Sequence, residues 1–206
     1  MRAPVKLFLA SSNPGKLNEY RVLAENAGQT SVFSVELELL PKFPTLPEFD
    51  ETAPTFAENA AGKALHYSRL SESLVFADDS GLVVPALGGA PGVHSARYAG
   101  AHATNSQRIE KLLSEMRGKV GSERSAHFVC AIVLARKGRA LAVVTERVDG
   151  EILESPRGAG GFGYDPVFYF PALKETFAEL SPGDKNQHSH RGKAFRKLLA
   201  ALSSML

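Results

Sequence analysis

Four polar segments of the chain carry side chains that could bind or cleave a charged ligand. The first follows an apolar run at residues 5–10 and presents hydroxyl, amide and ammonium groups, in Ser11, Ser12, Asn13 and Lys16. The free backbone N–H groups at a helix N-terminus favour an anion, so this segment is a candidate phosphate cradle. The spacing of a Walker motif is missing, and an ordinary helix N-cap beside a solvated lysine remains the alternative.

The second segment, Asp78-Asp79-Ser80-Gly81, places two adjacent carboxylates at the end of an apolar strand. Neighbouring side chains of a strand point to opposite sides, so we expect one carboxylate to enter a given site while the other fixes the loop or a partner group. Mg²⁺ commonly takes one or two protein carboxylates, completed by phosphate oxygens and water. The segment is therefore a candidate magnesium site, with an Asx turn closed by Gly81 as the structural alternative.

Further charged groups surround the start of the next expected helix. Asp50, Glu51 and Glu58 could add carboxylates to the same cation, although acidic residues at this place often only complement the helix dipole. Lys63 follows on the same helix, where a lysine is more often solvated than a ligand.

The third segment has the glycine spacing of a dinucleotide-binding loop at residues 158–163. That fingerprint needs a helix that begins within the glycines, whereas a strand-like run at residues 167–170 follows here. What remains is a loop that presents Phe162, Tyr164 and Asp165, and Phe162 could stack on a base. A core aromatic between turn glycines is the alternative.

The fourth segment concentrates positive charge before the last expected helix, in Lys185, His188, His190, Arg191 and Lys193. Such a surface could bind a planar or phosphorylated ligand, or it could be a solvated basic face. The histidine spacing is poor for a zinc site. A nucleotide with its metal would use all four segments.

The hydrophobic pattern predicts the elements that position these segments. Strands are expected at residues 5–10, 35–39, 74–79 and 167–170, with an antiparallel hairpin at 125–135 and 140–148. Helices are expected at residues 17–27, from a Thr55 cap to Tyr67, from a Thr104 cap to Met116, and at 192–206. This pattern indicates an α/β protein with a mixed sheet.

Composition bounds the function classes. A chain of 206 residues with 44% hydrophobic and 22% charged residues indicates one folded domain over residues 1–206. The net charge of +2 lacks the basic excess of a dedicated nucleic-acid binder. No stretch approaches the roughly 20 apolar residues of a membrane span, so we expect a cytoplasmic protein. We interpret the single cysteine, Cys130, as a buried small hydrophobe within an apolar run.

The chain resembles the inosine triphosphate pyrophosphatase family across nearly its whole length. The matching stretches occur in the family's order and are LASSNPGK at 9–16, TFAENA at 55–60, ADDSGL at 77–82, LGGAPG at 87–92, SARY at 95–98, GGFGYDP at 160–166 and SHRG at 189–192. Members of that family hydrolyse non-standard purine nucleoside triphosphates such as ITP, dITP and XTP. The resemblance implies an elongated central mixed β-sheet with flanking helices, two lobes around a substrate cleft, and a homodimer. It also implies Mg²⁺-dependent release of pyrophosphate to leave the nucleoside monophosphate.

The resemblance also implies roles for individual residues. Asp79 would be the catalytic proton acceptor and a metal ligand, assisted at the metal by Glu51 or Asp50. The phosphates would meet Ser11, Ser12, Asn13, Pro14, Gly15, Lys16 and Lys63. Ser80 would touch the substrate, and the nucleotide, chiefly its base, would meet Phe162, Gly163, Tyr164, Asp165, Lys185, His190 and Arg191.

Two positions depart from the family's pattern. The family commonly has threonine-glycine where Ser11-Ser12 stand, which preserves a hydroxyl, and an apolar residue where His188 stands. Two other functions stay open: a pyrophosphatase for modified pyrimidine nucleotides, and a nucleotide- or RNA-binding module without turnover. The second rests on the basic cluster from Lys185 to Lys193.

Overall fold

A computed structural model describes residues 4–28 and 34–205. The chain divides into two compact units: unit 1 holds residues 1–79, 130–146 and 191–206, and unit 2 holds residues 80–129 and 147–190. The described strands form a mixed sheet in the order β2-β1-β3-β4-β5-β6-β7. Their bounds are β1 Val5–Leu9, β2 Val35–Leu39, β3 Leu74–Val83, β4 Ser125–Arg136, β5 Arg139–Ile152, β6 Phe168–Phe170 and β7 Glu175–Thr176.

The helices follow the expected pattern with one addition. They are α1 Pro14–Gly28, α2 Phe56–Ser68, α3 Asn105–Glu115, α4 Pro182–His188 and α5 His190–Ser203. The short helix α4 was not expected, and α5 begins at His190 rather than at Gly192, so His190 and Arg191 are its first residues. Over the described ranges, no helix combines the length and apolar character needed to cross a bilayer.

Strand β3 corrects one expectation. The strand was expected to end at the two aspartates, but it continues through Ser80 and Gly81 to Val83. The continuation is stabilised at Leu82, whose buried N–H donates to Ser95 Oγ at 2.9 Å. Asp78 and Asp79 therefore lie within a regular strand, so their directions follow from its alternation and not from a turn.

The predicted hairpin is confirmed by the turn between β4 and β5. Lys137 and Gly138 form a two-residue connection with positive φ angles of 51° and 74°. Two positive φ values in a two-residue loop are typical of the tight turns that match the twist of a hairpin.

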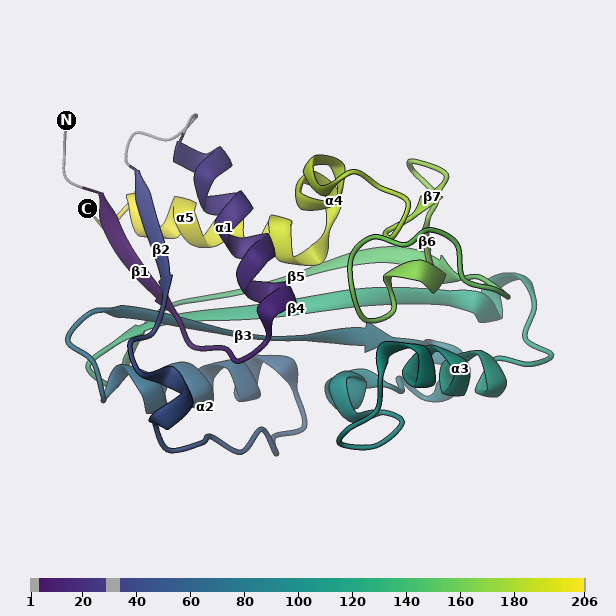
Figure 1. The fold of residues 1–206 in the computed structure, drawn as a ribbon, viewed down its shortest axis with the longest axis horizontal. Helices are drawn as coiled ribbons and strands as arrows, with labels where there is room; N and C mark the ends of the chain where they lie inside the picture. The colour runs from purple at the N-terminus through teal and green to yellow at the C-terminus, as the bar shows by residue number, and fades with distance from the viewer. Residues whose placement is uncertain (1–3, 29–33, 206) are drawn as a thin grey trace. The chain divides into compact units, whose positions relative to one another are not determined.

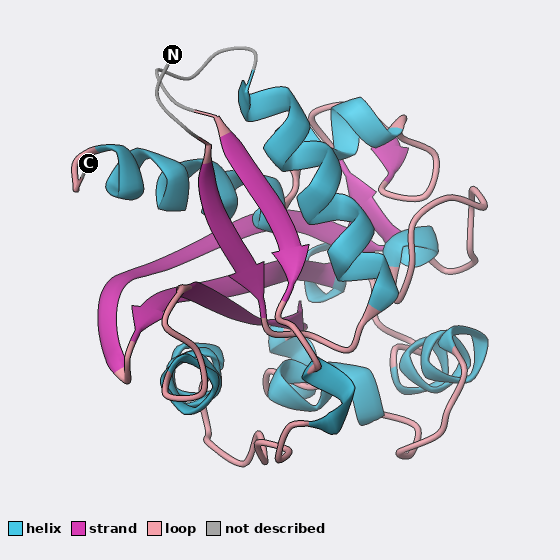
Figure 2. Ribbon diagram, turned by 60° about the vertical axis from the view of Figure 1, so that its left-hand side comes forward, coloured by secondary structure: helices cyan, strands magenta, loops and turns pink. Residues whose placement is uncertain are grey.

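Unit 1 packs helices on both faces of its strands. Leu7 and Leu9 of β1 share a core with α1 and α5, whereas Phe8, between them, shares a core with α2. The same alternation continues in β4, where Ile132 lies in the first core and Val133 in the second. Strands β1 and β2 run parallel beside α1 (Figures 1 and 2). Strands β1, β3 and β4 are therefore covered on both faces, whereas β5 leaves Leu141 and Val143 exposed.

Unit 2 has a core of its own that is rich in aromatic rings. Phe168 and Phe177 are fully buried, with ring centroids 4.9 Å apart, and Phe128 packs 4.6 Å from Phe168. Helix α3 adds Leu112 to this core, and its start is a complete capping box between Thr104 and Gln107, as the sequence predicted.

The aromatic cluster of unit 1 predicts the stability effect of one substitution. Phe195 of α5 is fully buried, with its ring centroid 5.2 Å from that of Tyr20 and 5.8 Å from that of Phe76. We expect Phe195→Ala to lower the free energy of unfolding by about 3–5 kcal/mol, because the cavity removes both ring contacts. Urea denaturation measures the change, with the exposed Ser203→Ala on the same helix as the control; equal stability of the two variants would contradict this packing.

Candidate active site

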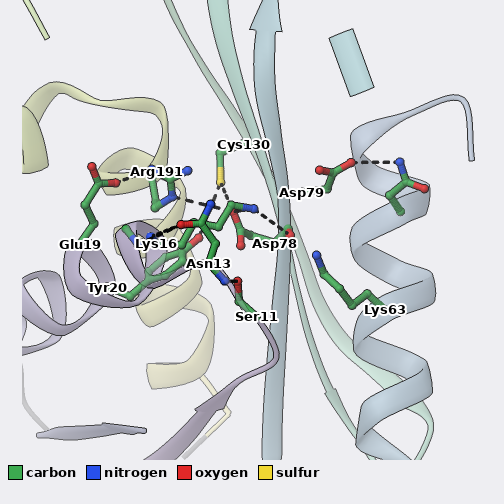
Figure 3. A network of polar contacts seen from close by, with 12 residues as sticks. Ser11, Asn13, Lys16, Glu19, Tyr20, Lys63, Asp78, Asp79, Cys130 and Arg191 are labelled. Carbon is green, nitrogen blue, oxygen red and sulfur yellow. Dashed lines mark hydrogen bonds and ion pairs between the residues drawn. The ribbon is translucent and has the colours of Figure 1, made fainter. Parts of the chain in front are cut away.

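The two adjacent aspartates of β3 point to opposite faces of the sheet. Val75 and Ala77 belong to the core beneath α2, and Phe76 belongs to the core beneath α1 and α5. By the same alternation, Asp79 lies on the α2 face and Asp78 on the α1 and α5 face, as Figure 3 shows. The expectation that the two carboxylates point to opposite sides of the strand is confirmed.

On the α2 face, Asp79 lies in a cluster of polar groups from α2 and the segment before it. Asn59 Nδ2 donates to Asp79 Oδ2 at 3.0 Å. The same amide holds the preceding segment, since its Oδ1 accepts from Ala53 N at 2.9 Å. Lys63, one turn after Asn59, is buried and forms an ion pair with Glu51. Asn59 thus joins the segment that carries Glu51 to the strand that carries Asp79.

The charges of this cluster shift the pKa values of both Asp79 and Lys63. Burial and the negative charge of Glu51 raise the pKa of Asp79 to about 6, against the opposing effects of Lys16, Asn59 and Lys63. Burial acts to lower the pKa of Lys63, but the charges of Asp78 and Glu51 raise it above its ordinary value. A bound cation would stabilise the ionised form of a carboxylate whose pKa is raised in this way.

The donor set of this cluster fits Mg²⁺. In the part of the chain that the structure describes, no three His, Cys, Asp or Glu side chains form a group that could enclose a metal ion. Mg²⁺ does not need one, because one or two carboxylates suffice when phosphate oxygens and water complete the shell. Of the two acidic neighbours considered, Asp50 is exposed, and Glu51 is the one whose charge acts on Asp79. Glu58 is also exposed and bonds to its own cap residue, Thr55.

The loop from Ser11 to Lys16 is built as a helix N-cap. Asn13 Oδ1 accepts from the backbone N–H groups of Gly15 and Lys16 at 2.9 and 3.2 Å, and Ser11 Oγ accepts from Asn13 N at 3.2 Å. Ser12 and Pro14 are exposed, and Pro14 is the first residue of α1. The N-cap is therefore confirmed, but Lys16 is not the solvated lysine of that alternative, because its side chain is 13% exposed and pairs with Asp78. Contact of this loop with phosphates stays a prediction.

Opposite Asp79, the carboxylate of Asp78 forms the centre of a buried charge network. Lys16 Nζ lies 3.0 Å from Asp78 Oδ2, and Arg191 Nε lies 3.8 Å from the same oxygen. Arg191 also forms an ion pair with Glu19 of α1 (Figure 3). Burial acts to raise the pKa of Asp78, but Lys16 and Arg191 lower it below its ordinary value. Asp78 is thus held as a charged carboxylate.

Cys130 lies at the edge of this network. It is fully buried, and burial raises the pKa of its thiol to about 12. Its Sγ lies 3.8 Å from Tyr20 Oη and 4.0 Å from Asp78 Oδ2. The interpretation of Cys130 as a buried small residue is confirmed.

In unit 2, one carboxylate organises the glycine loop. Asp165 Oδ2 accepts from Phe162 N at 2.7 Å and from Lys185 Nζ at 2.6 Å, and both charged side chains are buried. Lys185 Nζ also lies 5.0 Å from the centre of the Phe162 ring. A Cβ on Gly161 would lie 2.1 Å from Asp165 Oδ2, so only glycine fits this bend, where φ is +68°. Asp165 therefore supports Phe162 and Lys185 from within the protein.

The remaining candidates of unit 2 are packed against aromatic rings or against the chain. The His190 ring stacks on Phe128 at 4.6 Å with an interplanar angle of 9°. His188 packs 5.6 Å from Phe170, which gives it a structural place in α4. Tyr164 is buried, and its hydroxyl donates to Ser95 O at 2.9 Å. Gly163 has φ +64° and open space around its Cα, and Ser80 is half-buried in β3.

The predicted residues thus divide between the two units. In unit 1, Asp79, Glu51 and Lys63 lie on one face of β3, and Lys16 with the Ser11 loop and Arg191 lies beside Asp78 on the other. Unit 2 brings together Phe162, Asp165 and Lys185. Sequence reasoning missed Asn59 and Glu19. The spacing of four between Asn59 and Lys63, which places both on one helix face, is a signal that could have found Asn59. Nothing local to Glu19 indicates its partner, which is 172 residues away.

Comparison with known proteins supplies relatives that match almost the whole chain. A protein from Geobacillus kaustophilus described as "dITP/XTP pyrophosphatase" is 51% identical over 193 residues, which cover 94% of this chain and 92% of the relative. One from Gloeobacter violaceus with the same description is 47% identical, with 96% and 94% covered. The solved structure of a HAM1 protein from Coxiella burnetii matches with a TM-score of 0.83 and 40% identity, over 97% of this chain and 99% of that one. The model of the Ham1 family matches residues 7–201. This chain therefore belongs to the Ham1 family.

Proposed function

We propose that this protein is a nucleoside triphosphate pyrophosphatase that hydrolyses dITP, ITP and XTP to the nucleoside monophosphate and pyrophosphate, with Mg²⁺ as cofactor. The observation that carries the proposal is the Asp79 cluster, in which two mutually repelling carboxylates lie beside the buried Lys63. Relatives described as dITP/XTP pyrophosphatases support the substrate class. A homodimer and a cytoplasmic location, both expected from the sequence, are parts of the same proposal.

Asp79 is the proton acceptor in this proposal. A carboxylate whose pKa is about 6 can take a proton from water near neutral pH more readily than an ordinary aspartate. Asn59 orients the carboxylate by donating to Oδ2, and the other oxygen would orient the water toward the α-phosphorus. Asp79 and Glu51 would also hold the Mg²⁺, which supplies charge neutralisation at the phosphate oxygens.

Three lysines are proposed to meet negative charge on the substrate. Transfer of a phosphoryl group depends mainly on positioning and charge neutralisation, so fixed ammonium groups lower the barrier without covalent chemistry. Lys16 and Lys63 are each held by a carboxylate of unit 1, and Lys185 by Asp165 of unit 2. The Ser11 loop and Ser80 complete the proposed contacts.

For the base, we propose stacking on Phe162 and recognition by donors. Phe162 is half-buried; its backbone N–H donates to Asp165, and Lys185 Nζ lies near its ring. Hypoxanthine and xanthine carry an oxygen at position 6 that accepts hydrogen bonds, whereas adenine carries a donor there. Donors of unit 2 such as Lys185 and backbone N–H groups would therefore disfavour adenine. His190 would support this surface through its stacking on Phe128.

A substrate survey tests the proposal directly. With Mg²⁺ present, dITP, ITP and XTP should give monophosphate and pyrophosphate in one step, well above ATP, and a chelator should abolish the reaction until Mg²⁺ is restored. Products are identified by ion-exchange chromatography and an enzymatic pyrophosphate assay. Orthophosphate as the first product would refute attack at the α-phosphorus, and tight binding of nucleotides without turnover would favour a binding module.

Substitution of Asp79 tests the base. We expect Asp79→Asn to lower kcat for dITP at least about a hundredfold, since it removes the proton acceptor and a metal ligand. The neighbouring acidic residues provide matched comparisons: Glu51→Gln should also reduce turnover, and Asp50→Asn should leave it unchanged because its side chain is exposed. Steady-state kinetics on variants of unchanged melting temperature measure these effects, and normal turnover by folded Asp79→Asn would remove Asp79 from the mechanism.

Substitution of Gly161 tests the loop that presents Phe162. The methyl group of Gly161→Ala would lie 2.1 Å from Asp165 Oδ2 and would displace the carboxylate that holds Phe162 and Lys185. We expect the KM for dITP to rise about tenfold, which corresponds to about 1.4 kcal/mol of binding. Gly163→Ala, at φ +64° but with open space, should have a smaller effect. An unchanged KM in Gly161→Ala would show that this loop does not bind the substrate.

A further inference from the structure

The buried carboxylate of Asp78 has no part in the chemistry proposed for Asp79. Its side chain is 0% exposed and lies on the α1 and α5 face, opposite Asp79, although its charge also acts on Lys63. Lys16 Nζ lies 3.0 Å from Asp78 Oδ2 and also donates to the backbone oxygen of Asp78 at 3.4 Å. One residue of β3 therefore holds the ammonium group of Lys16 through two oxygens.

Two contacts of this kind restrict a side chain that is otherwise flexible. A lysine carries a compact charge on a four-carbon chain with many rotamers, and ordering it costs entropy when a ligand binds. Lys16 is 13% exposed at its side chain, so most of that ordering is already present in the folded protein. A pre-ordered ammonium group meets a phosphate without this cost at the moment of binding.

A second ion pair holds Asp78 in turn. Arg191 Nε lies 3.8 Å from Asp78 Oδ2, and the guanidinium also pairs with Glu19. Glu19 lies three residues after Lys16 in α1, so both side chains lie on the same face of this helix. The order Lys16, Asp78, Arg191 and Glu19 alternates in sign and connects α1, β3 and α5.

Stability alone does not account for such a network. Buried ion pairs lose hydration that their attraction repays poorly, and apolar residues of similar volume are often at least as stabilising. The position of the Lys16 ammonium group, by contrast, depends on these contacts. That position matters for catalysis, because a group misplaced by about 1 Å can cost on the order of a hundredfold in rate.

We propose that Asp78 is a positioning residue that fixes the Lys16 ammonium group for the triphosphate, with the Arg191 and Glu19 pair holding Asp78 in place. This inference rests on the proposed function, in which Lys16 meets the phosphates, and it assigns Asp78 a role distinct from that of its neighbour Asp79.

A double-mutant cycle tests the proposal, since coupling between two residues appears as non-additive effects. The variants are Asp78→Asn, Lys16→Ala and the combination of the two. Asp78→Asn should lower kcat/KM for dITP by about ten- to a hundredfold, mainly through KM, because a displaced Lys16 weakens contact with the phosphates. In the Lys16→Ala background the same change should cost less than about twofold. Equal losses in both backgrounds would overturn the proposal, because Asp78 would then act independently of Lys16.

A stability control separates positioning from damage to the fold. Leu23→Ala removes a buried side chain from α1 without touching the charge network, and it should lower the melting temperature while kcat/KM stays unchanged. If Asp78→Asn does not fold, Glu19→Gln replaces it in the cycle, since Glu19 is 14% exposed and its substitution loosens Arg191 without removing Asp78. Additive losses for Glu19→Gln and Lys16→Ala would then overturn the proposal.

Binding of inorganic tripolyphosphate, measured by calorimetry, distinguishes this inference from the proposed function. If the protein releases no pyrophosphate from dITP, the proposed function fails, and the same cycle is read from the dissociation constant of tripolyphosphate. Weaker binding in Asp78→Asn that disappears in the Lys16→Ala background would support positioning. Binding that is unaffected by Asp78→Asn, or absent from the wild-type protein, would overturn it.

Discussion

Adjacent side chains of a β-strand must point to opposite faces of the sheet. In unit 1 this constraint determines the directions of the two aspartates of β3, and therefore which residues each can contact. Because β3 is covered by α2 on one face and by α1 and α5 on the other, each carboxylate meets a different set of partners. Asp79 meets Asn59 on α2, and Asp78 meets Lys16 on α1. Had the strand ended before these residues, neither orientation would be determined by the sheet.

The two faces give the same residue type opposite electrostatic properties. Both carboxylates are buried, which by itself raises the pKa of each. At Asp78 the charges of Lys16 and Arg191 outweigh burial and keep the group ionised, whereas at Asp79 the negative charge of Glu51 adds to burial. Environments that separate the pKa values of two neighbouring acids are a common way of dividing structural and chemical roles.

Unit 2 applies a similar principle to a loop. Asp165 is a buried acceptor that holds one backbone N–H group and one ammonium group, and through them it supports the half-buried ring of Phe162. The glycine at position 161 is required because the carboxylate occupies the space of a Cβ. In each unit, therefore, a buried carboxylate holds a group that is proposed to touch the substrate: Asp78 holds Lys16, and Asp165 holds Phe162 and Lys185.

The sequence by itself determined the elements whose signals are local. The alternation in β2, the capping box at Thr104 and the hairpin between β4 and β5 each depend on residues a few positions apart, and all three are confirmed. The motifs also placed the chain in its family. Local signals were weaker at α4, which starts with Pro182 and Gly183. They were also weaker after Asp79, where the strand was expected to end and instead continued to Val83.

Only the tertiary structure decided which neighbours share an environment. Asp50 and Glu51 are equivalent in sequence, and the ion pair with the buried Lys63 distinguishes Glu51. The partners of Asp79 and Asp78 come from α2, α1 and α5, and Glu19 meets Arg191 across a separation of 172 residues. Such contacts follow from packing helices on both faces of one strand, so they depend on the whole fold and not on any pattern within a short stretch of the chain.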